Sequence, residues 1–384
     1  MRYSLRHGRE EIHKEKRMSQ RRARARARDV GIVPGVLNPG ARNSIADVAG
    51  ILVGHETLIE GENIRTGATA ILPHAGNLFQ DRVPAGLSVA NGHGKMIGAT
   101  QLVELGEIET PIVLTNTLAV PRAAEAILDW TFAQSANASA RSVNPIVGET
   151  NDGTLNAIEA RPLTADRIRS AIDRAAAGPI EEGSVGAGTG TTAMGWKAGI
   201  GTSSRVLPKW LGGYTLGVLV QTNVPGSLCV LGAPIGRLLG VESLSTKEKS
   251  TEPRGSIMIV VATDAPLSDR NLTRLARRTF VGLARTGATF SNGSGDYAIA
   301  FSTAESVRRT SERRAGQATV TELPNERVSP LFEAAIEATE EAVLNSLFAA
   351  RTMTGRDGRT IEALPVDHVA EILTERGAFA GDPR

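Results

Sequence analysis

Residues 248–264, Glu-Lys-Ser-Thr-Glu-Pro-Arg-Gly-Ser-Ile-Met-Ile-Val-Val-Ala-Thr-Asp, join two physically opposite segments. Residues 246–254 are charged, contain a proline and lack any large apolar side chain, which predicts an exposed loop. Residues 257–261 are apolar and rich in β-branched side chains, and their length suits a buried strand. The stretch therefore predicts a buried strand that begins with Ser256, directly behind a flexible loop ending in Gly255.

A serine at this junction suits a particular chemistry. A serine hydroxyl is a weak nucleophile and needs a base. If the chain cuts itself between Gly255 and Ser256, the freed α-amine of Ser256 can be that base, because its unperturbed pKa lies near ~8. The Gly-Ser dipeptide occurs four times in the chain, but only here does it join a charged loop to a buried strand. The junction is thus typical of the self-cleavage bond of an N-terminal nucleophile hydrolase.

The composition is that of an ordinary globular protein, with 384 residues, 41% hydrophobic and 22% charged. Cys229 is the single cysteine, so an intrachain disulfide and a thiolate metal cluster are excluded. The six histidines include no pair at metal-ligand spacing, and no apolar run is long enough for a membrane helix. Residues 188–193 match GxGxxA but lack the preceding buried strand of a dinucleotide site. We therefore expect no metal, no cofactor and no membrane association.

The charge is distributed unevenly along the chain. Residues 1–28 carry 11 Lys and Arg against 3 Glu, whereas the remainder carries 32 basic against 38 acidic residues. The Arg-rich run at residues 21–28 leaves a nucleic-acid-binding arm open, but a disordered basic tail over residues 1–30 is the preferred interpretation. The tail lacks the apolar core of a secretory signal, which predicts a cytoplasmic protein, and Met18 is an alternative start to Met1.

Hydrophobic periodicity and turn residues predict a mixture of strands and helices on both sides of residue 255. The predicted strands lie at 45–53, 66–72, 87–89, 111–115, 214–222, 257–261 and 297–301. The predicted helices lie at 121–135, 165–177, 268–287, 329–348 and 367–376. Because neither half has a separate core, residues 31–384 are expected to form a single catalytic domain that stays associated after a cut.

Five motifs in order carry a family resemblance. They are residues 146–156, 185–205, 220–223, 254–257 and 291–296. Together they resemble the DmpA-type L-aminopeptidase/D-esterase family of self-processing peptidases, which includes the β-peptidyl aminopeptidases. The resemblance implies an α/β fold arranged as a four-layer αββα sandwich, and cleavage into an α fragment (1–255) and a β fragment (256–384). It also implies a homo-oligomer of processed pairs, expected to be a tetramer.

The same resemblance assigns the catalytic residues. Ser256 matches the nucleophile, Asn223 the oxyanion-hole donor, and Ser294 with Asp296 the second serine and its acid. The β-peptide-cleaving members carry Glu where this chain has Asp296, which leaves that specificity open. Each residue also has a structural alternative, since Ser256 can simply begin a strand and the others can be turn or capping residues.

Two further residues are assigned to substrate binding. Glu149 matches the acid that receives the substrate's amino group, although a structural ion pair is its alternative. Asn151 stands where some members carry an aromatic residue, so the pocket shape does not transfer. The predicted protein is a serine aminopeptidase that acts on short peptides, amides or esters. One alternative is an acyltransferase of the ornithine acetyltransferase type, which uses Thr in place of Ser256. The other is a non-catalytic binding protein with an Arg-rich arm.

Overall fold

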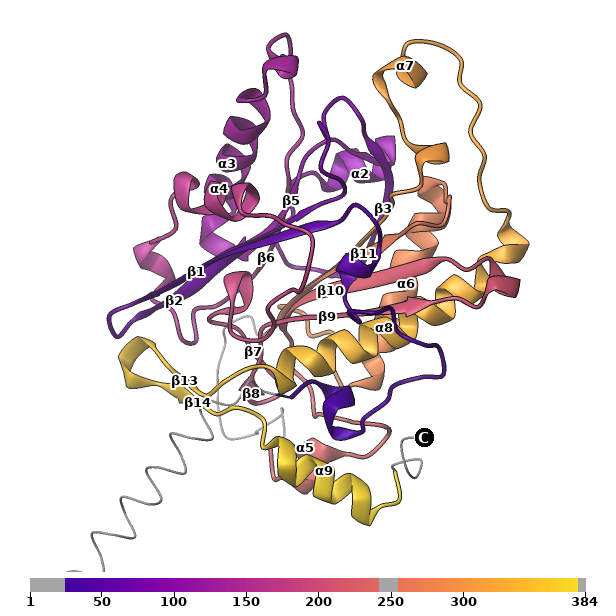
Figure 1. Cartoon of the computed structure of the whole chain (residues 1–384). Helices are drawn as coiled ribbons and strands as arrows, with labels where there is room; N and C mark the ends of the chain where they lie inside the picture. The colour runs from indigo at the N-terminus through magenta and orange to yellow at the C-terminus, as the bar shows by residue number, and fades with distance from the viewer. Residues whose placement is uncertain (1–24, 242–254, 379–384) are drawn as a thin grey trace, which may run out of the picture.

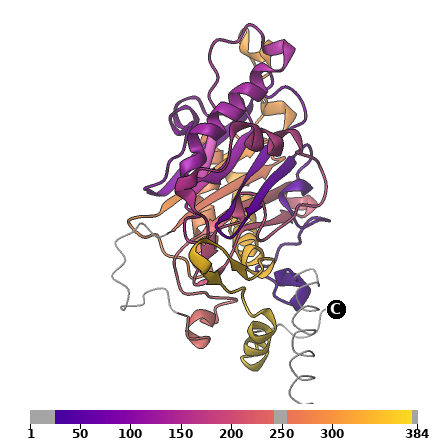
Figure 2. The same cartoon turned by 90° about the vertical axis from the view of Figure 1, so that its left-hand side faces the viewer.

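The computed structural model describes residues 25–241 and 255–378. The basic tail up to residue 24 and the predicted loop at 246–254 lie outside the described residues. Two β-sheets face each other, and helices cover the outer face of each sheet (Figures 1 and 2). The four-layer αββα sandwich expected from the sequence is therefore the observed architecture.

The smaller sheet has the strand order β1-β2-β5-β6, and the larger has the order β4-β3-β12-β11-β10-β9. The strands of the smaller sheet are β1 (Leu52–Glu60), β2 (Ile64–Leu72), β5 (Ile112–Asn116) and β6 (Ile146–Thr150). Those of the larger sheet are β3 (Val83–Gly92), β4 (Glu107–Ile108), β9 (Ile200–Val206), β10 (Thr215–Asn223), β11 (Ser256–Thr263) and β12 (Gly295–Ser302). Two short hairpins, β7 (Thr192–Ala193) with β8 (Trp196–Lys197) and β13 (Met353–Thr354) with β14 (Thr360–Ile361), lie outside these sheets.

The helices divide between the two outer layers. α3 (Val120–Phe132) and α4 (Ala165–Asp173) pack on the smaller sheet, whereas α6 (Asp269–Arg285) and α8 (Ser329–Phe348) pack on the larger one. The remaining helices are α2 (Ala99–Leu105), α5 (Ile235–Leu238), α7 (Ser311–Arg314) and α9 (Val366–Glu375). None of the helices within the described parts of the chain combines the length and apolarity required to cross a membrane.

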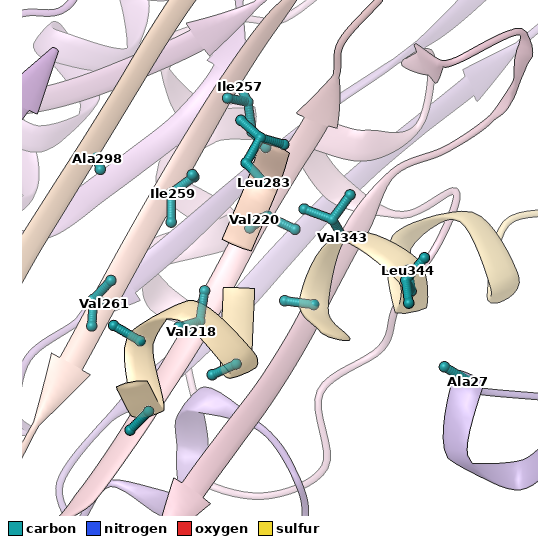
Figure 3. Close-up of a cluster of buried hydrophobic side chains, with 14 of the residues drawn as sticks. Ala27, Val218, Val220, Ile257, Ile259, Val261, Leu283, Ala298, Val343 and Leu344 are labelled. Carbon is teal, nitrogen blue, oxygen red and sulfur yellow. The ribbon is translucent and has the colours of Figure 1, made fainter. Parts of the chain in front are cut away.

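Strand β11 lies between the helix layer and the other sheet, so both of its faces are buried. Side chains alternate between the two faces of a strand. Met258, Val260 and Ala262 join the core between the two sheets. Ile257, Ile259 and Val261 join Leu283 of α6 with Val343 and Leu344 of α8 in the core beneath the helices (Figure 3). The alternation explains why residues 257–261 form a continuous apolar run, and it directs the Ser256 side chain toward the space between the sheets.

Most of the predicted elements are confirmed, with shifted ends. α3 ends three residues before the predicted 135, and α4 ends at Asp173 rather than 177. The strand predicted at 45–53 is wrong. Residues Ile45–Asp47 form a 3-10 helix, and the strand begins only at Leu52. The Asp47 carboxylate accepts hydrogen bonds from the main-chain N–H groups of Arg42 and Ser44, at 2.9 Å and 3.1 Å, which favours a tight turn over an extended chain.

The segment that follows the basic tail is packed against the body, unlike the disorder expected up to residue 30. Ala27 is fully buried, and its N–H donates to the Asn345 side chain of α8 at 3.0 Å. Arg28 forms an ion pair with Glu341 of the same helix at 2.8 Å. The Arg-rich composition did not predict this contact, because the partners on α8 lie more than 300 positions away in the sequence.

Candidate active site

The ends of three strands bring together the residues predicted to carry the chemistry. In the antiparallel pairing of β10 with β11, Asn223 lies directly opposite Ser256. In the parallel pairing of β11 with β12, Ser256 lies beside Gly295, whose neighbours are Ser294 and Asp296. All four polar residues are buried, with Ser256 6% and Asn223 8% exposed. Residues separated by up to 73 positions in the chain thus meet where these three interior strands of the larger sheet end or begin.

Gly255, which precedes Ser256, has a main-chain conformation that requires glycine. Gly255 adopts φ +106, and a Cβ atom at this position would lie 2.2 Å from Cδ of Pro225. Any L-amino acid with a side chain would therefore be strained as well as crowded there. The Ser256 hydroxyl donates a hydrogen bond to the carbonyl oxygen of Gly255. The nucleophile candidate thus lies against the carbonyl group of the peptide bond that would be cut.

The Asn223 side chain is oriented by a main-chain group that sequence reasoning missed. Its amide oxygen accepts a hydrogen bond from the N–H of Thr192 at 3.0 Å. This assigns the oxygen end of the amide to Thr192, so the NH2 end is the one left to donate. The segment bearing Thr192 is held in turn by the buried Lys197, whose ammonium group donates to the carbonyl of Gly188 at 3.1 Å. Burial lowers the pKa of Lys197 to about 7.

Ser294 and Asp296 form a buried hydrogen-bonded pair. The Ser294 hydroxyl donates to Oδ1 of Asp296 at 2.6 Å, while Oδ2 has no hydrogen-bond partner among the described residues. Burial raises the pKa of Asp296 to about 6, and the hydrogen bond from Ser294 acts in the opposite direction. Asp296 is the register partner of Ile257, whose side chain faces the helix layer. The pair is therefore placed beside the main chain of Ser256 rather than beside its hydroxyl.

Glu149 belongs to the same neighbourhood although it comes from the other sheet. Its carboxylate accepts hydrogen bonds from the N–H of Lys95, at 3.0 Å, and from the Thr117 hydroxyl. A Cβ added to Gly94 would lie 3.3 Å from this carboxylate and 3.2 Å from Cα of Gly295. The same Cβ would lie 2.7 Å from Cε2 of Tyr297, so Gly94 is closely packed between Glu149 and the strand that flanks Ser256.

Asn151 is separated from this cluster by its own turn. It is exposed just beyond the end of β6, and its side-chain oxygen accepts a hydrogen bond from the N–H of Gly153 at 2.9 Å. Its described hydrogen bond is therefore local, and it does not link Asn151 to Ser256 or Glu149.

Two other buried polar residues lie on the strands that carry the site, and neither was predicted. Tyr297 donates its hydroxyl to the carbonyl of Gly94 at 2.9 Å, and burial raises its pKa, with the charges of Glu149 and Asp296 adding to the shift. Gln221 reaches across the two sheets, with its Nε2 at 3.0 Å from the carbonyl of Thr115 and 2.9 Å from the Thr150 hydroxyl. Alternating polar residues near strand ends, such as Gln221 and Asn223, were the available signal in the sequence.

The polar groups gathered here are those of acyl-transfer chemistry. They comprise a hydroxyl beside a carbonyl, an amide donor opposite it, a hydroxyl–carboxyl pair and a further carboxylate. Across the described ranges, 25–241 and 255–378, no group of three or more His, Cys, Asp or Glu side chains is arranged to hold a metal ion.

Comparison with known proteins decides the family. Residues 43–361 match peptidase family S58. The chain is also 40% identical over 368 residues, 91% of each protein, to the β-peptidyl aminopeptidase BapA of Sphingosinicella microcystinivorans. The chain belongs to peptidase family S58. The family resemblance noted in the sequence is thereby confirmed, and the protein is a hydrolase of the aminopeptidase type.

Two solved structures support this assignment at the level of the fold. A protein from Pyrococcus horikoshii is 44% identical and superposes with a TM-score of 0.84, covering 92% of this chain and 99% of its own. The l-aminopeptidase d-ala-esterase/amidase of Ochrobactrum anthropi is 36% identical, with a TM-score of 0.85, covering 94% of this chain and 100% of its own. The latter is described as a prototype of the serine aminopeptidases and as a variant of the Ntn hydrolase fold. The S58 chain described here shares that fold.

Proposed function

We propose that this S58 peptidase is a self-processing serine aminopeptidase that releases N-terminal residues from short peptides, amides or esters. Ser256 is the nucleophile, and its α-amine, freed by cleavage after Gly255, is the base. The observation that carries the proposal is the strand register that aligns Ser256 with Asn223 on one side and with Gly295 on the other. The aminopeptidase names of the relatives from Sphingosinicella and Ochrobactrum support the same reaction.

Self-cleavage comes first in this proposal. The Ser256 oxygen attacks the carbonyl carbon of Gly255, the C–N bond between the two residues breaks, and the hydroxyl proton passes to the departing nitrogen. The product is an ester between Gly255 and the Ser256 oxygen. Water then hydrolyses the ester, leaving a carboxylate on Gly255 and a free hydroxyl and amine on Ser256. Before the cut no amine is available, and in this proposal the Ser294–Asp296 pair, which lies beside the main chain of Ser256, assists transfer of the proton to the departing nitrogen.

The mature reaction uses the group that the cut releases. The neutral α-amine of Ser256 takes the hydroxyl proton as the oxygen attacks the substrate carbonyl, and the Asn223 amide stabilises the negative charge that develops on the carbonyl oxygen. The proton then passes to the leaving amine or alcohol, and water releases the acyl group from Ser256. In this proposal Ser294 and Asp296 hold the α-amine.

Glu149 supplies the preference for an N-terminal residue. Its carboxylate is 3% exposed and already accepts two hydrogen bonds, so it is held in one orientation next to Gly94 and Gly295. A substrate ammonium group that pairs with it brings the first peptide bond toward Ser256. Asn151, which is exposed just beyond β6, is proposed to contact the substrate at the rim of the site.

The two fragments are expected to remain one unit after the cut. β10 belongs to the fragment before residue 255, and it pairs with β11 of the other fragment along the whole of β11. The proposed homo-oligomer of processed pairs, expected to be a tetramer, is built from this unit and is testable by the mass of the native particle.

Intact-mass analysis of purified wild type tests the proposal, together with hydrolysis of an aminoacyl-p-nitroanilide. We expect two fragments, the second beginning at Ser256, and release of p-nitroaniline. Ser256→Ala should give one full-length inactive chain. Ser184→Ala is the matched control, because Ser184 also follows a glycine of positive φ, at φ +82, but lies outside the strands. A wild type that remains one active chain would overturn the mechanism, and acetyl transfer to ornithine in place of hydrolysis would overturn the reaction.

A further inference from the structure

The end of strand β3 contacts both halves of the site. The Asn91 side chain donates from Nδ2 to the carbonyl of Asn292 at 3.1 Å and to the carbonyl of Ser294. The N–H of His93 donates to the same Ser294 carbonyl at 3.2 Å. The main chain of Ser294 is therefore held by two donors from one short segment.

The same segment also reaches Glu149. The N–H of Lys95 donates to the Glu149 carboxylate at 3.0 Å, and the carbonyl of Gly94 accepts the Tyr297 hydroxyl at 2.9 Å. Residues 91–95 thus form a bridge between the pair on β12 and the carboxylate on β6. The Asn91 end of this bridge bonds the turn that carries Ser294, whereas the Lys95 end bonds Glu149, so a variant can be chosen at each end.

The regular pairing between β3 and β12 is interrupted at this point. Asn91 pairs with Asp296 and Val89 pairs with Tyr297, which leaves one residue of β3 unpaired and shifts the register between Asp296 and Tyr297. A bulge of this kind re-aims side chains and loosens the ladder locally. The Asn91 amide supplies hydrogen bonds where the ladder is irregular, and these hold the turn that carries Ser294.

We propose that Asn91 is a positioning residue for the Ser294–Asp296 pair, and that it acts through the turn at residues 291–294. The inference rests on the proposed function, since it assigns the pair a role in catalysis. The Ser294 N–H donates to the carbonyl of Ser291 at 3.0 Å, which closes the turn, and the Asn91 amide fixes that turn to β3. Without the amide, the Ser294 carbonyl keeps the His93 N–H as its donor from β3, and the Ser294 hydroxyl is held less firmly beside the main chain of Ser256.

Asn91→Asp is the sharpest test, because it keeps the shape of the side chain but replaces two N–H donors with an oxygen facing two carbonyl groups. We expect kcat per matured molecule to fall about 10- to 100-fold, at or below the lower limit of roughly 100-fold for removing a proton-transfer group, because Asn91 acts only through that group. KM should change less than about twofold, because Glu149 is untouched. Cleavage after Gly255 should slow in parallel, and intact mass gives the matured fraction used for normalisation.

Two further variants, Asn91→Ala and Thr117→Val, serve as comparisons for Asn91→Asp. Asn91→Ala leaves room for water to donate to the freed carbonyls, so we expect a smaller loss of kcat than with Asn91→Asp, and it serves if the aspartate variant fails to fold. Thr117→Val removes a donor from Glu149 at the other end of the site. It should raise KM for the p-nitroanilide about 3- to 10-fold and leave kcat within about twofold, which is the pattern for lost ground-state binding.

Measurements on wild type distinguish a failure of the proposed function from a failure of the positioning role of Asn91. If wild type is not cut or does not hydrolyse the substrate, the proposed function fails. If wild type is cut and active, and both Asn91 variants match its kcat and maturation rate, the positioning role is overturned. A common rise in KM for the Asn91 and Thr117 variants would also overturn it, because the bridge would then act through Glu149.

Discussion

Two groups of buried charged side chains differ in how completely they are hydrogen-bonded. In the Arg205 cluster, which joins Arg205 to Glu337 and Glu341 of α8, every carboxylate oxygen accepts at least one bond. The Arg205 guanidinium also donates to the carbonyls of Pro34 and Ser204, at 2.8 Å and 2.7 Å. In the site cluster, by contrast, Oδ2 of Asp296 is buried without a partner within the described chain.

The difference indicates different roles. The Glu337 and Glu341 carboxylates are both held by main-chain or side-chain donors and by Arg205, and the cluster ties the segment after the tail to β9 and α8. An unsatisfied buried oxygen has a cost that a folded protein retains only with a reason. We infer that Oδ2 of Asp296 has no partner in the uncut chain because it will bind the ammonium group that Ser256 acquires on cleavage. The Arg205 cluster is therefore expected to affect stability, and the site cluster to affect the rate.

The largest expected effect is on stability, from Arg205→Leu. The change leaves the Glu337 and Glu341 carboxylates buried without their cation, which costs about 3–5 kcal/mol of unfolding free energy. Chemical denaturation measures it, best in a Ser256→Ala background so that a single uncut chain unfolds. A loss below about 1 kcal/mol would show that the cluster is not a structural tie.

Next in size is Asn223→Ala, which should act on the rate rather than on the fold. Loss of one oxyanion donor lowers kcat about 10²- to 10³-fold, or roughly 3–4 kcal/mol of transition-state stabilisation. Steady-state kinetics of the matured enzyme measures it. Asn325→Ala removes an exposed amide that contacts Arg270 and Arg274, and it should leave the rate unchanged. An equally small effect at Asn223 would remove it from the oxyanion hole.

Asp296→Asn should displace the acid limb of the pH–rate profile. The α-amine of Ser256 must be neutral to act as base, and a nearby carboxylate raises its pKa. Removing that charge lowers the pKa of the amine, so the limb moves to lower pH, by up to about one unit or ~1.4 kcal/mol. Burial raises the pKa of Asp296 to about 6 in the uncut chain, and the ammonium group formed on cleavage acts in the opposite direction. Asp296 is therefore charged across a limb near pH ~8, where the two profiles should differ.

The midpoint of the limb is the quantity to compare, since the overall rate also falls if the pair moves a proton. Asp296→Glu keeps the charge and should keep the limb near that of wild type. A limb that stays in place or moves to higher pH in Asp296→Asn would contradict a carboxylate–ammonium contact.

The smallest effect is expected for an ion pair at the surface. Arg167 and Glu60 approach to 3.0 Å, but their side chains are 41% and 52% exposed. Water screens the pair, so Glu60→Gln should change the unfolding free energy by less than about 1 kcal/mol. Denaturation under the conditions used for Arg205→Leu measures it, and a loss as large as that of Arg205 would show that burial is not what separates the two.

The local sequence pattern predicted much of the fold, because many helices and strands can be recognised from their own apolar spacing and end residues. The apolar run at 257–261 needs no partner to be recognised as a buried strand, and α8 begins as predicted at Ser329 with a proline in its first turn. Among the strands that were not predicted, β6 and β9 are the longest. Each contains glycine or short polar residues, which lower β-propensity, and each is stabilised by neighbouring strands and by contacts across the core.

The sequence by itself determined that Ser256 begins a buried strand behind a charged loop, and five ordered motifs were enough to predict the family and the αββα arrangement. Only the tertiary structure decided which groups orient the site. Thr192 acts on Asn223 through its main-chain N–H, and Lys95 acts on Glu149 in the same way. Every residue except proline has such an N–H, so its type reveals nothing of its partner. The partner is set by strand register and by the packing of two sheets, which bring distant parts of the chain together.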